Sequence, residues 1–158
     1  MLKVLFICTH NACRSILAER ILGTRAGGLL ETASAGSAPG GRVHPLTLSH
    51  LHQAGFSTSG LASKGYEDVA DFDPDVVITV CDRAAGEACP LWLDATPRVH
   101  WGLPDPSHLP GTDAERSAAF ARVMQTLERR ARALRERVTP GLSRDRIIAI
   151  LTELAELS

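Results

Sequence analysis

The sequence lacks long apolar runs and any marked excess of charge. No apolar stretch approaches the roughly 20 residues that span a membrane, and the segment after Met1 and Lys3 is too short for a signal peptide. Eighteen acidic residues nearly balance seventeen Lys and Arg, which leaves a net charge of −1. This balance argues against nucleic acid or an anionic membrane as the main partner. We therefore expect a cytoplasmic protein.

Internal repeats, low-complexity tracts and zinc-type cysteine pairs are also absent. The four cysteines are spaced C-x4-C and C-x7-C, and neither spacing is a C-x2-4-C zinc hairpin with a matching partner. No metal is expected. Because cytosolic thiols are kept reduced, we interpret these cysteines as reactive groups, not as a disulfide framework. With 158 residues, 44% of them hydrophobic, the chain is predicted to form one domain over residues 1–158.

Four short apolar runs predict the strands of a β-sheet, at residues 2–8, 29–35, 76–80 and 98–101. Near-continuous hydrophobic strands are typical of parallel sheets that helices cover on both faces. Apolar periodicity and capping signals predict the helices, at residues 15–26, 45–54, 112–138 and 147–154. The predicted fold is three-layer α/β with a central four-stranded parallel sheet, and the last helix is expected to close the second face of that sheet.

The first strand leads directly into a loop that ends at a helix. The strand ends at Cys8, five residues separate Cys8 from Arg14, and helical periodicity starts at Ser15. The unpaired N–H groups and the positive dipole end of a helix N-terminus form an anion site, and Arg14 can grip two oxygens of that anion. The predicted oxyanion-binding residues are Thr9, His10, Asn11, Ala12, Cys13, Arg14 and Ser15.

The same positive field acts on the Cys8 thiol. It favours the thiolate, which is the nucleophilic form of cysteine, so Cys8 is predicted to attack a bound oxyanion. The alternative is a buried cysteine that merely ends a strand. Cys13 has two interpretations as well: a second reactive thiol, or a small residue packed under the loop, and the second is favoured.

A second cysteine, Cys81, follows the buried strand at residues 76–80. Parallel strands bring their carboxyl ends to one edge of the sheet, so Cys8 and Cys81 are predicted to lie there together. Residues 82–88 lack apolar periodicity and are expected to be mobile, and Cys89 follows them. A Cys81–Cys89 disulfide would close a short loop. The alternative is a pair of buried cysteines near a turn.

Asp105 lies between Pro104 and Pro106, just after the fourth predicted strand. The two prolines hold it in an extended segment near the same sheet edge, although an Asp in such a context is more commonly a turn residue. Further along the surface, His50 and His52 are two residues apart and share no helix face, so both are expected to be exposed.

These motifs resemble the low-molecular-weight tyrosine phosphatase family. The resemblance rests on C-x5-R-S after a first strand, on Asn11, and on the I-L-A-E that follows. That family contains phosphotyrosine hydrolases and arsenate reductases. The resemblance implies that Asp105, in its D-P segment, is a general acid. The segments at residues 77–82, 89–90 and 100–102 resemble the arsenate reductases of the family.

The resemblance implies reduction of arsenate to arsenite by a relay of Cys8, Cys81 and Cys89, with phosphate or sulfate as competing oxyanions. No tightly bound cofactor is expected. The partner would be an external thiol reductant, thioredoxin or glutathione with glutaredoxin, and both stay open because seven residues separate Cys81 from Cys89 where the thioredoxin-linked reductases have six. A monomer is expected. The alternatives are a tyrosine phosphatase and a redox sensor or oxyanion-binding module without turnover.

Overall fold

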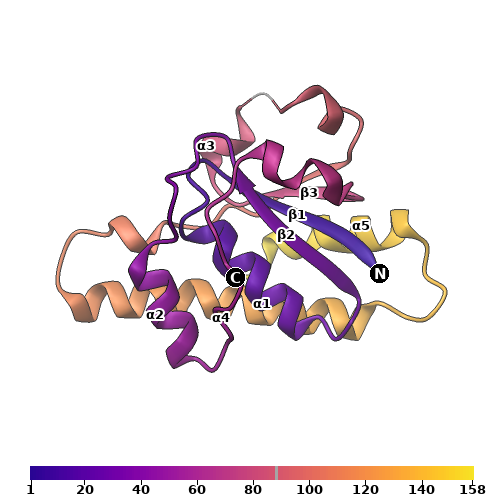
Figure 1. Ribbon diagram of the computed structural model, residues 1–158. Helices are drawn as coiled ribbons and strands as arrows, with labels where there is room; N and C mark the ends of the chain where they lie inside the picture. Colours follow the sequence, from indigo (N-terminus) through magenta and orange to yellow (C-terminus); the bar gives the residue numbers. More distant parts are fainter. Residues whose placement is uncertain (88) are drawn as a thin grey trace.

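The computed structural model, which describes residues 1–87 and 89–158, is built around one parallel sheet. The sheet has the strand order β2-β1-β3-β4, with all neighbouring pairs parallel (Figure 1). The strands are β1 (Leu2–Cys8), β2 (Leu30–Gly36), β3 (Val76–Thr79) and β4 (Arg98–His100). The predicted fold class is confirmed. β1 lies in the centre, which explains why its sequence is almost entirely apolar.

In the described part of the chain, five α-helices and four 3-10 turns connect and cover the strands. The helices are α1 (Arg14–Arg25), α2 (Pro45–Gln53), α3 (Asp82–Ala85), α4 (Asp113–Arg137) and α5 (Arg144–Glu153). The 3-10 turns are η1 (Tyr66–Phe72), η2 (Leu91–Leu93), η3 (Pro106–His108) and η4 (Leu154–Glu156). The long helix α4 begins with the predicted capping box, in which Thr112 accepts a hydrogen bond from the Glu115 amide.

The segment predicted to be mobile, residues 82–88, begins with a helical turn. α3 forms there because the Cys81 side chain caps it, and the Ala84 N–H donates to Cys81 Sγ at 3.3 Å. A four-residue turn carries no apolar period, so the sequence pattern did not reveal it. Residue 88 of the predicted segment lies outside the described residues.

Helices α1 and α5 cover the same face of the sheet. Phe6 of β1 contacts Trp101, with ring centroids 6.0 Å apart, and the Trp101 indole N–H donates to the Leu151 carbonyl of α5 at 2.8 Å. The register partner of Phe6 on β2 is Ser34, which donates to Glu19 of α1. The prediction that the last helix closes the second face is therefore wrong. α4 packs across both helices.

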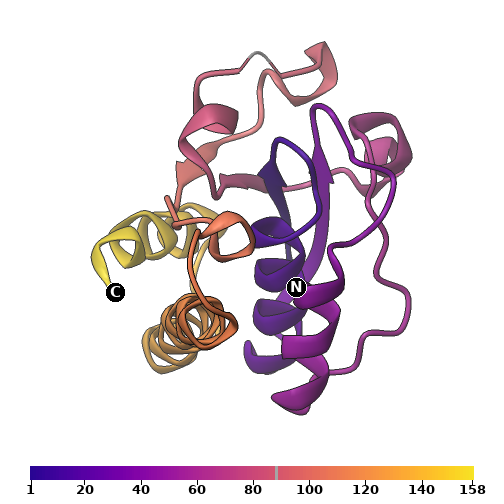
Figure 2. The same cartoon turned by 90° about the vertical axis from the view of Figure 1, so that its left-hand side faces the viewer.

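The β3 to β4 connection and η1, the last part of the β2 to β3 connection, lie on the opposite face, whereas α2 packs beside α1. Both connections cross the sheet in the direction opposite to the β1 to β2 connection, and right-handed crossovers then place these segments opposite α1. Lys3, on this face, lies 5.9 Å from the Phe72 ring of η1. Figure 2 shows η1 and the segment around α3 on this side. No helix in the described part of the chain is long and apolar enough to cross a membrane.

Candidate active site

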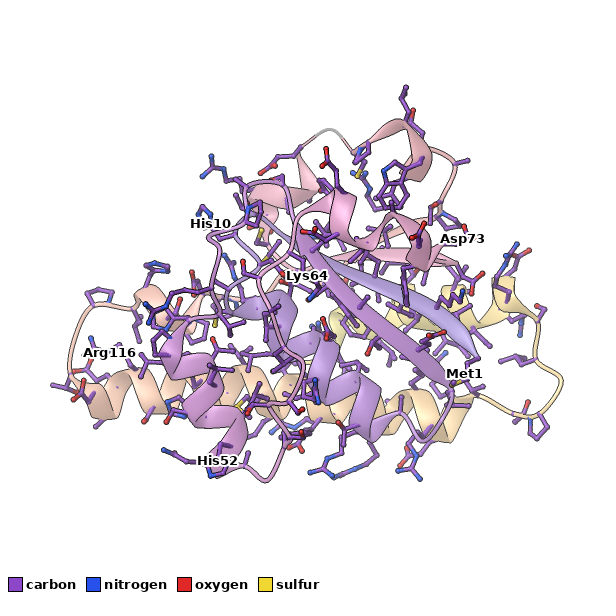
Figure 3. The ribbon with its side chains drawn as sticks, viewed as in Figure 1. Met1, His10, His52, Lys64, Asp73 and Arg116 are labelled. Atoms are coloured by element: carbon purple, nitrogen blue, oxygen red, sulfur yellow. The ribbon has the colours of Figure 1, made fainter. Side chains whose placement is uncertain are left out.

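The loop after β1 turns its carbonyl groups outward. The Ala38 N–H donates to Thr9 O at 2.9 Å, the Gly40 N–H to His10 O at 3.0 Å, and the His44 N–H to Ala12 O at 2.9 Å. In a trans peptide the following N–H points the opposite way from the carbonyl. The amides after these carbonyls therefore point into the loop, as an anion site requires. His10, labelled in Figure 3, marks the exposed rim of this loop.

A fully buried asparagine fixes the shape of the loop. Asn11 has a left-handed backbone with φ of 46°, and its Nδ2 donates to Ser15 Oγ at 2.8 Å and to Ser34 Oγ at 2.9 Å. Its Oδ1 accepts from the Lys64 N–H at 2.7 Å. Asn11 thus ties the loop to α1, to β2 and to the segment before η1, where Figure 3 labels Lys64. The sequence analysis placed Asn11 among the oxyanion-binding residues, and these contacts add a structural role in the loop.

Gly36 at the end of β2 lets the loop approach closely. A Cβ at this position would lie 2.5 Å from Thr9 O and 2.9 Å from Asn11 N.

We expect Gly36→Ala to lose about 1–3 kcal/mol of stability, as overpacked sites do, and to weaken phosphate binding. Urea unfolding and phosphate titration measure both effects. Gly40→Ala is the matched control, since a Cβ there meets nothing within 4 Å, and equal losses in the two variants would contradict the prediction.

Cys8 lies at the base of the loop and is 5% exposed. Its Sγ is 2.8 Å from Ser15 Oγ and accepts a hydrogen bond from the Asn11 N–H at 3.3 Å. These contacts hold the Cys8 sulfur at the base of the loop, where the sequence analysis predicted a nucleophile.

Arg14 and Asp105 meet across the mouth of this pocket. Arg14 Nη1 donates to Leu103 O at 3.0 Å, and Nη2 lies 3.7 Å from Asp105 Oδ2. The pocket has a volume of about 40 Å³, so it has room for a small ion and not for an aromatic ring. Its walls include loop residues from Cys8 to Arg14 and, from outside the loop, His44, Asp105, Ser107 and His108.

The carboxyl group of Asp105 is hydrogen-bonded on both oxygens. The Ser107 hydroxyl donates to Oδ1 at 2.6 Å and His108 Nδ1 lies 2.8 Å from Oδ2. Burial opposes ionisation, but these bonds, together with the Ser107 N–H and the Arg14 charge, outweigh it and lower the pKa of Asp105 below its ordinary value. Asp105 is therefore ionised at neutral pH in the free protein.

Because the pKa of Asp105 is lowered, its contribution to the stability of the protein depends on pH. A carboxyl group with a depressed pKa in the folded state stabilises the protein above its unfolded pKa, and the contribution disappears as the pH falls through the folded value. We expect Asp105→Asn to lower the free energy of unfolding by a constant amount above about pH 5 and by progressively less below about pH 4. Urea unfolding of both proteins across this range is the measurement. A difference that persists at low pH would contradict the assignment.

Cys13 is a packed residue and not a second reactive thiol. It is 6% exposed, and burial, with smaller effects of Asp105 and Cys8, raises its pKa to about 12 against the hydrogen bonds from Thr47 and Ser107. A thiol with so high a pKa stays protonated at neutral pH. The structure agrees with the favoured interpretation of Cys13 as a residue packed under the loop.

Cys81 emerges beside Cys8 at the carboxyl edge of the sheet. The Val80 N–H bonds to Ile7 O at 2.9 Å, so the two cysteines follow neighbouring strand positions. Cys81 is 2% exposed, and its Sγ lies 3.8 Å from Thr9 Oγ1 of the anion loop. The structure thus brings the second thiol to the loop, as predicted.

Cys89 lies further along the opposite face and is partly buried. The Arg98 guanidinium of β4 donates a hydrogen bond to its sulfur. It also neighbours Tyr66, whose pKa is raised to about 12 by burial and, to a smaller extent, by Cys89 and Glu87. Neither Arg98 nor Tyr66 was singled out in the sequence, because only the fold brings them together.

His50 and His52 on α2 differ in their exposure. His50 stacks on Phe120 with ring centroids 4.4 Å apart, and burial lowers its pKa, so the prediction of an exposed residue is wrong for His50. His52 is exposed, as predicted. His44 and His108 line the anion pocket and were missed in the sequence analysis, although His108 follows the D-P segment closely. The described residues contain no group of three or more His, Cys, Asp or Glu that could hold a metal.

Fold and site together define an α/β protein with a small pocket between a cysteine after its first strand and an arginine at the start of its first helix. The sequence profile of the low molecular weight phosphotyrosine protein phosphatases matches residues 3–144, and the chain belongs to this family. The family resemblance inferred from the motifs is confirmed.

Several relatives and solved structures are arsenate reductases. One from Halalkalibacterium halodurans is 33% identical over 133 residues, which cover 84% of this chain and 94% of that protein. A glutaredoxin arsenate reductase from Synechocystis is 34% identical over 106 residues, 67% of this chain and 79% of that protein. The structure of a thioredoxin-dependent arsenate reductase from Corynebacterium glutamicum matches with a TM-score of 0.63 at 30% identity, over 86% of this chain and 61% of that one.

Proposed function

We propose that this protein reduces arsenate to arsenite through a relay of Cys8, Cys81 and Cys89. One observation carries the proposal: Cys81 lies buried against Thr9 of the anion loop, 3.8 Å from its hydroxyl. Hydrolysis of a phosphate ester needs a nucleophile, an arginine and a proton donor, and it has no use for a second thiol there. Reduction needs that thiol, because two sulfurs must together supply two electrons.

In the proposed reaction the Cys8 thiolate attacks arsenate held by the loop amides and Arg14. Asp105, ionised in the free protein, acquires a proton when the arsenate dianion binds beside it, because a nearby negative charge raises a carboxyl pKa. It passes this proton to the departing oxygen. Cys81 then attacks Cys8 Sγ, a disulfide forms, the sulfur–arsenic bond breaks, and its electron pair leaves with arsenic as arsenite.

Cys89 would complete the relay. It attacks Cys81, releases Cys8 as a thiolate, and leaves a Cys81–Cys89 disulfide that an external dithiol reduces. Relatives that depend on thioredoxin and on glutaredoxin are both known, so either reductant fits. A relay that must be reset by thiols suits the cytosol, where thiols are kept reduced. We propose that the protein acts there as a monomer, with phosphate and sulfate as competing ions.

Steady-state production of arsenite tests this function. Purified protein is given arsenate with thioredoxin, thioredoxin reductase and NADPH, or with glutathione and glutaredoxin, and arsenite is measured directly. We expect turnover with at least one system and inhibition by phosphate. An aryl phosphate is tested in parallel. Hydrolysis of that ester without arsenite formation would identify a phosphatase, and binding of arsenate without turnover would identify a sensor or an oxyanion-binding module.

A further inference from the structure

Glu87, just beyond α3, reaches back to the anion loop. Its Oε1 accepts a hydrogen bond from Thr9 Oγ1 at 3.2 Å and lies 3.7 Å from Arg83 Nε. The same Thr9 hydroxyl lies 3.8 Å from Cys81 Sγ. A continuous chain of polar atoms therefore runs from the Cys81 sulfur through Thr9 to a carboxylate. The relay described above gives Glu87 no role.

The chemistry of Cys81, Thr9 and Glu87 fixes which group donates each hydrogen bond in this series. A carboxylate only accepts hydrogen bonds, and a threonine hydroxyl has one hydrogen to donate. Since Thr9 donates that hydrogen to Glu87, its oxygen faces Cys81 as an acceptor, and the Cys81 thiol must donate. The opposite side of the sulfur receives the Ala84 N–H at 3.3 Å. Cys81 is thus placed to lose a proton toward Glu87 while an amide stabilises the resulting thiolate.

Burial makes such a route necessary. Cys81 and Thr9 are only 2% and 6% exposed, so bulk water does not reach the thiol proton. The Glu87 side chain is 28% exposed, so a proton that reaches it exchanges with solvent. The chain connects a buried thiol that must ionise to a carboxylate that can release the proton.

We propose that Glu87 accepts the proton of Cys81, through Thr9, when Cys81 attacks the sulfur of Cys8. This inference rests on the proposed arsenate reduction. In the step, the Cys81 thiol proton moves to Thr9 Oγ1 as the hydroxyl proton of Thr9 moves to Glu87. The Cys81–Cys8 disulfide forms, the Cys8–arsenic bond breaks, and its electron pair reduces arsenic to arsenite. Transfer is concerted with attack, so the carboxylate need not be a stronger base than a free thiolate.

Two charged or polar groups lie near Glu87. Arg83 on α3 is a cation whose Nε lies 3.7 Å from Glu87 Oε1. Tyr66 of η1 is close enough to interact electrostatically with Glu87, and it remains neutral because its pKa is raised to about 12, chiefly by burial.

Single-turnover measurement of arsenite release by Glu87→Gln tests the inference. Glutamine can still accept the Thr9 hydrogen bond but is not a base, so the geometry is kept. We expect arsenite release at pH 7 to slow roughly 100-fold, the lower end of what a positioned proton acceptor contributes. Formation of the Cys8–arsenic adduct should be unchanged. Because bulk water does not reach the buried Cys81 thiol, raising the pH from about 6 to 9 should not restore the rate of the variant.

Further variants separate this role from a structural one. Thr9→Val should release arsenite as slowly as Glu87→Gln, whereas Thr9→Ser should release it at the wild-type rate. The double variant Thr9→Val with Glu87→Gln should be no slower than either single variant, because residues that act in the same proton-transfer path are not additive. Glu67→Gln is the control for charge, since Glu67 is an exposed acid on η1, and it should match the wild type.

The outcomes also separate this inference from the proposed function. If the wild type releases no arsenite on mixing, the arsenate reductase function itself is wrong. If the wild type releases arsenite and Glu87→Gln releases it at the same rate with the same pH dependence, only the role of Glu87 is overturned. A slower adduct formation in Glu87→Gln would assign Glu87 to the loop structure and would likewise overturn its role as proton acceptor.

Discussion

Replacement of Cys8 by serine is expected to abolish arsenate reduction, with a loss of roughly 1,000-fold or more. The Asn11 amide and the Ser15 hydroxyl that support a thiolate at this position cannot ionise an alcohol at neutral pH. Serine also cannot enter a disulfide, so the two electrons that reduce arsenic have no source. Arsenite production in the steady state and in a single turnover measures the effect.

A control measurement must show that the Cys8→Ser protein keeps an intact anion pocket. Serine is close to cysteine in size, and the loop is held by Asn11 and Gly36, not by the sulfur. Phosphate titration followed by calorimetry should therefore show binding to the Cys8→Ser protein within about tenfold of the wild type, roughly 1.4 kcal/mol or less. Arsenite production within tenfold of the wild type would overturn the role of Cys8.

Cys81→Ser and Cys89→Ser should fail at different steps. Without Cys81 the thiol left beside Cys8 is Cys13, whose pKa is raised to about 12 by burial, so it stays protonated and does not attack Cys8 Sγ. We expect arsenic to remain attached to Cys8, with no arsenite released on mixing with arsenate. Without Cys89, one equivalent of arsenite should form and a Cys8–Cys81 disulfide should accumulate, while turnover with an external reductant collapses.

The structure supplies the reason for this difference. Cys81 is the cap of α3 and contacts Thr9, whereas Cys89 is held at Arg98 on β4. A disulfide requires Cα atoms within about 7 Å and suitable Cβ directions. We expect the α3 turn to move when the Cys81 sulfur, which caps it, bonds to Cys89.

Mass spectrometry of quenched single-turnover samples, with disulfides mapped by peptide, distinguishes the variants. The expected species are a Cys8–arsenic adduct in Cys81→Ser and a Cys8–Cys81 disulfide in Cys89→Ser. A Cys8–Cys89 disulfide in the Cys81→Ser protein, with normal arsenite release, would reverse the two roles. Retention of full steady-state turnover by Cys89→Ser would remove Cys89 from the relay.

The sequence by itself determined the strands of the sheet, the loop after the first strand, and the positions of Cys8, Arg14 and Cys81 around that loop. The apolar runs ended at Cys8 and before Cys81, and C-x5-R placed Arg14 at a helix start. These are local patterns, in which each residue's neighbours along the chain fix its conformation. Parallel strands then bring both cysteines to one edge without further information.

Only the tertiary structure decided which residues support those groups. Asn11 meets Lys64 across 53 positions of the chain, and Thr9 meets Glu87 across 78, so no spacing rule relates them. The face of the sheet that α5 covers could not be predicted from the sequence either. An apolar stripe shows that a helix packs against other elements, but it does not identify them. Such contacts depend on crossover direction and on the packing of distant segments, and these arise only when the whole chain folds.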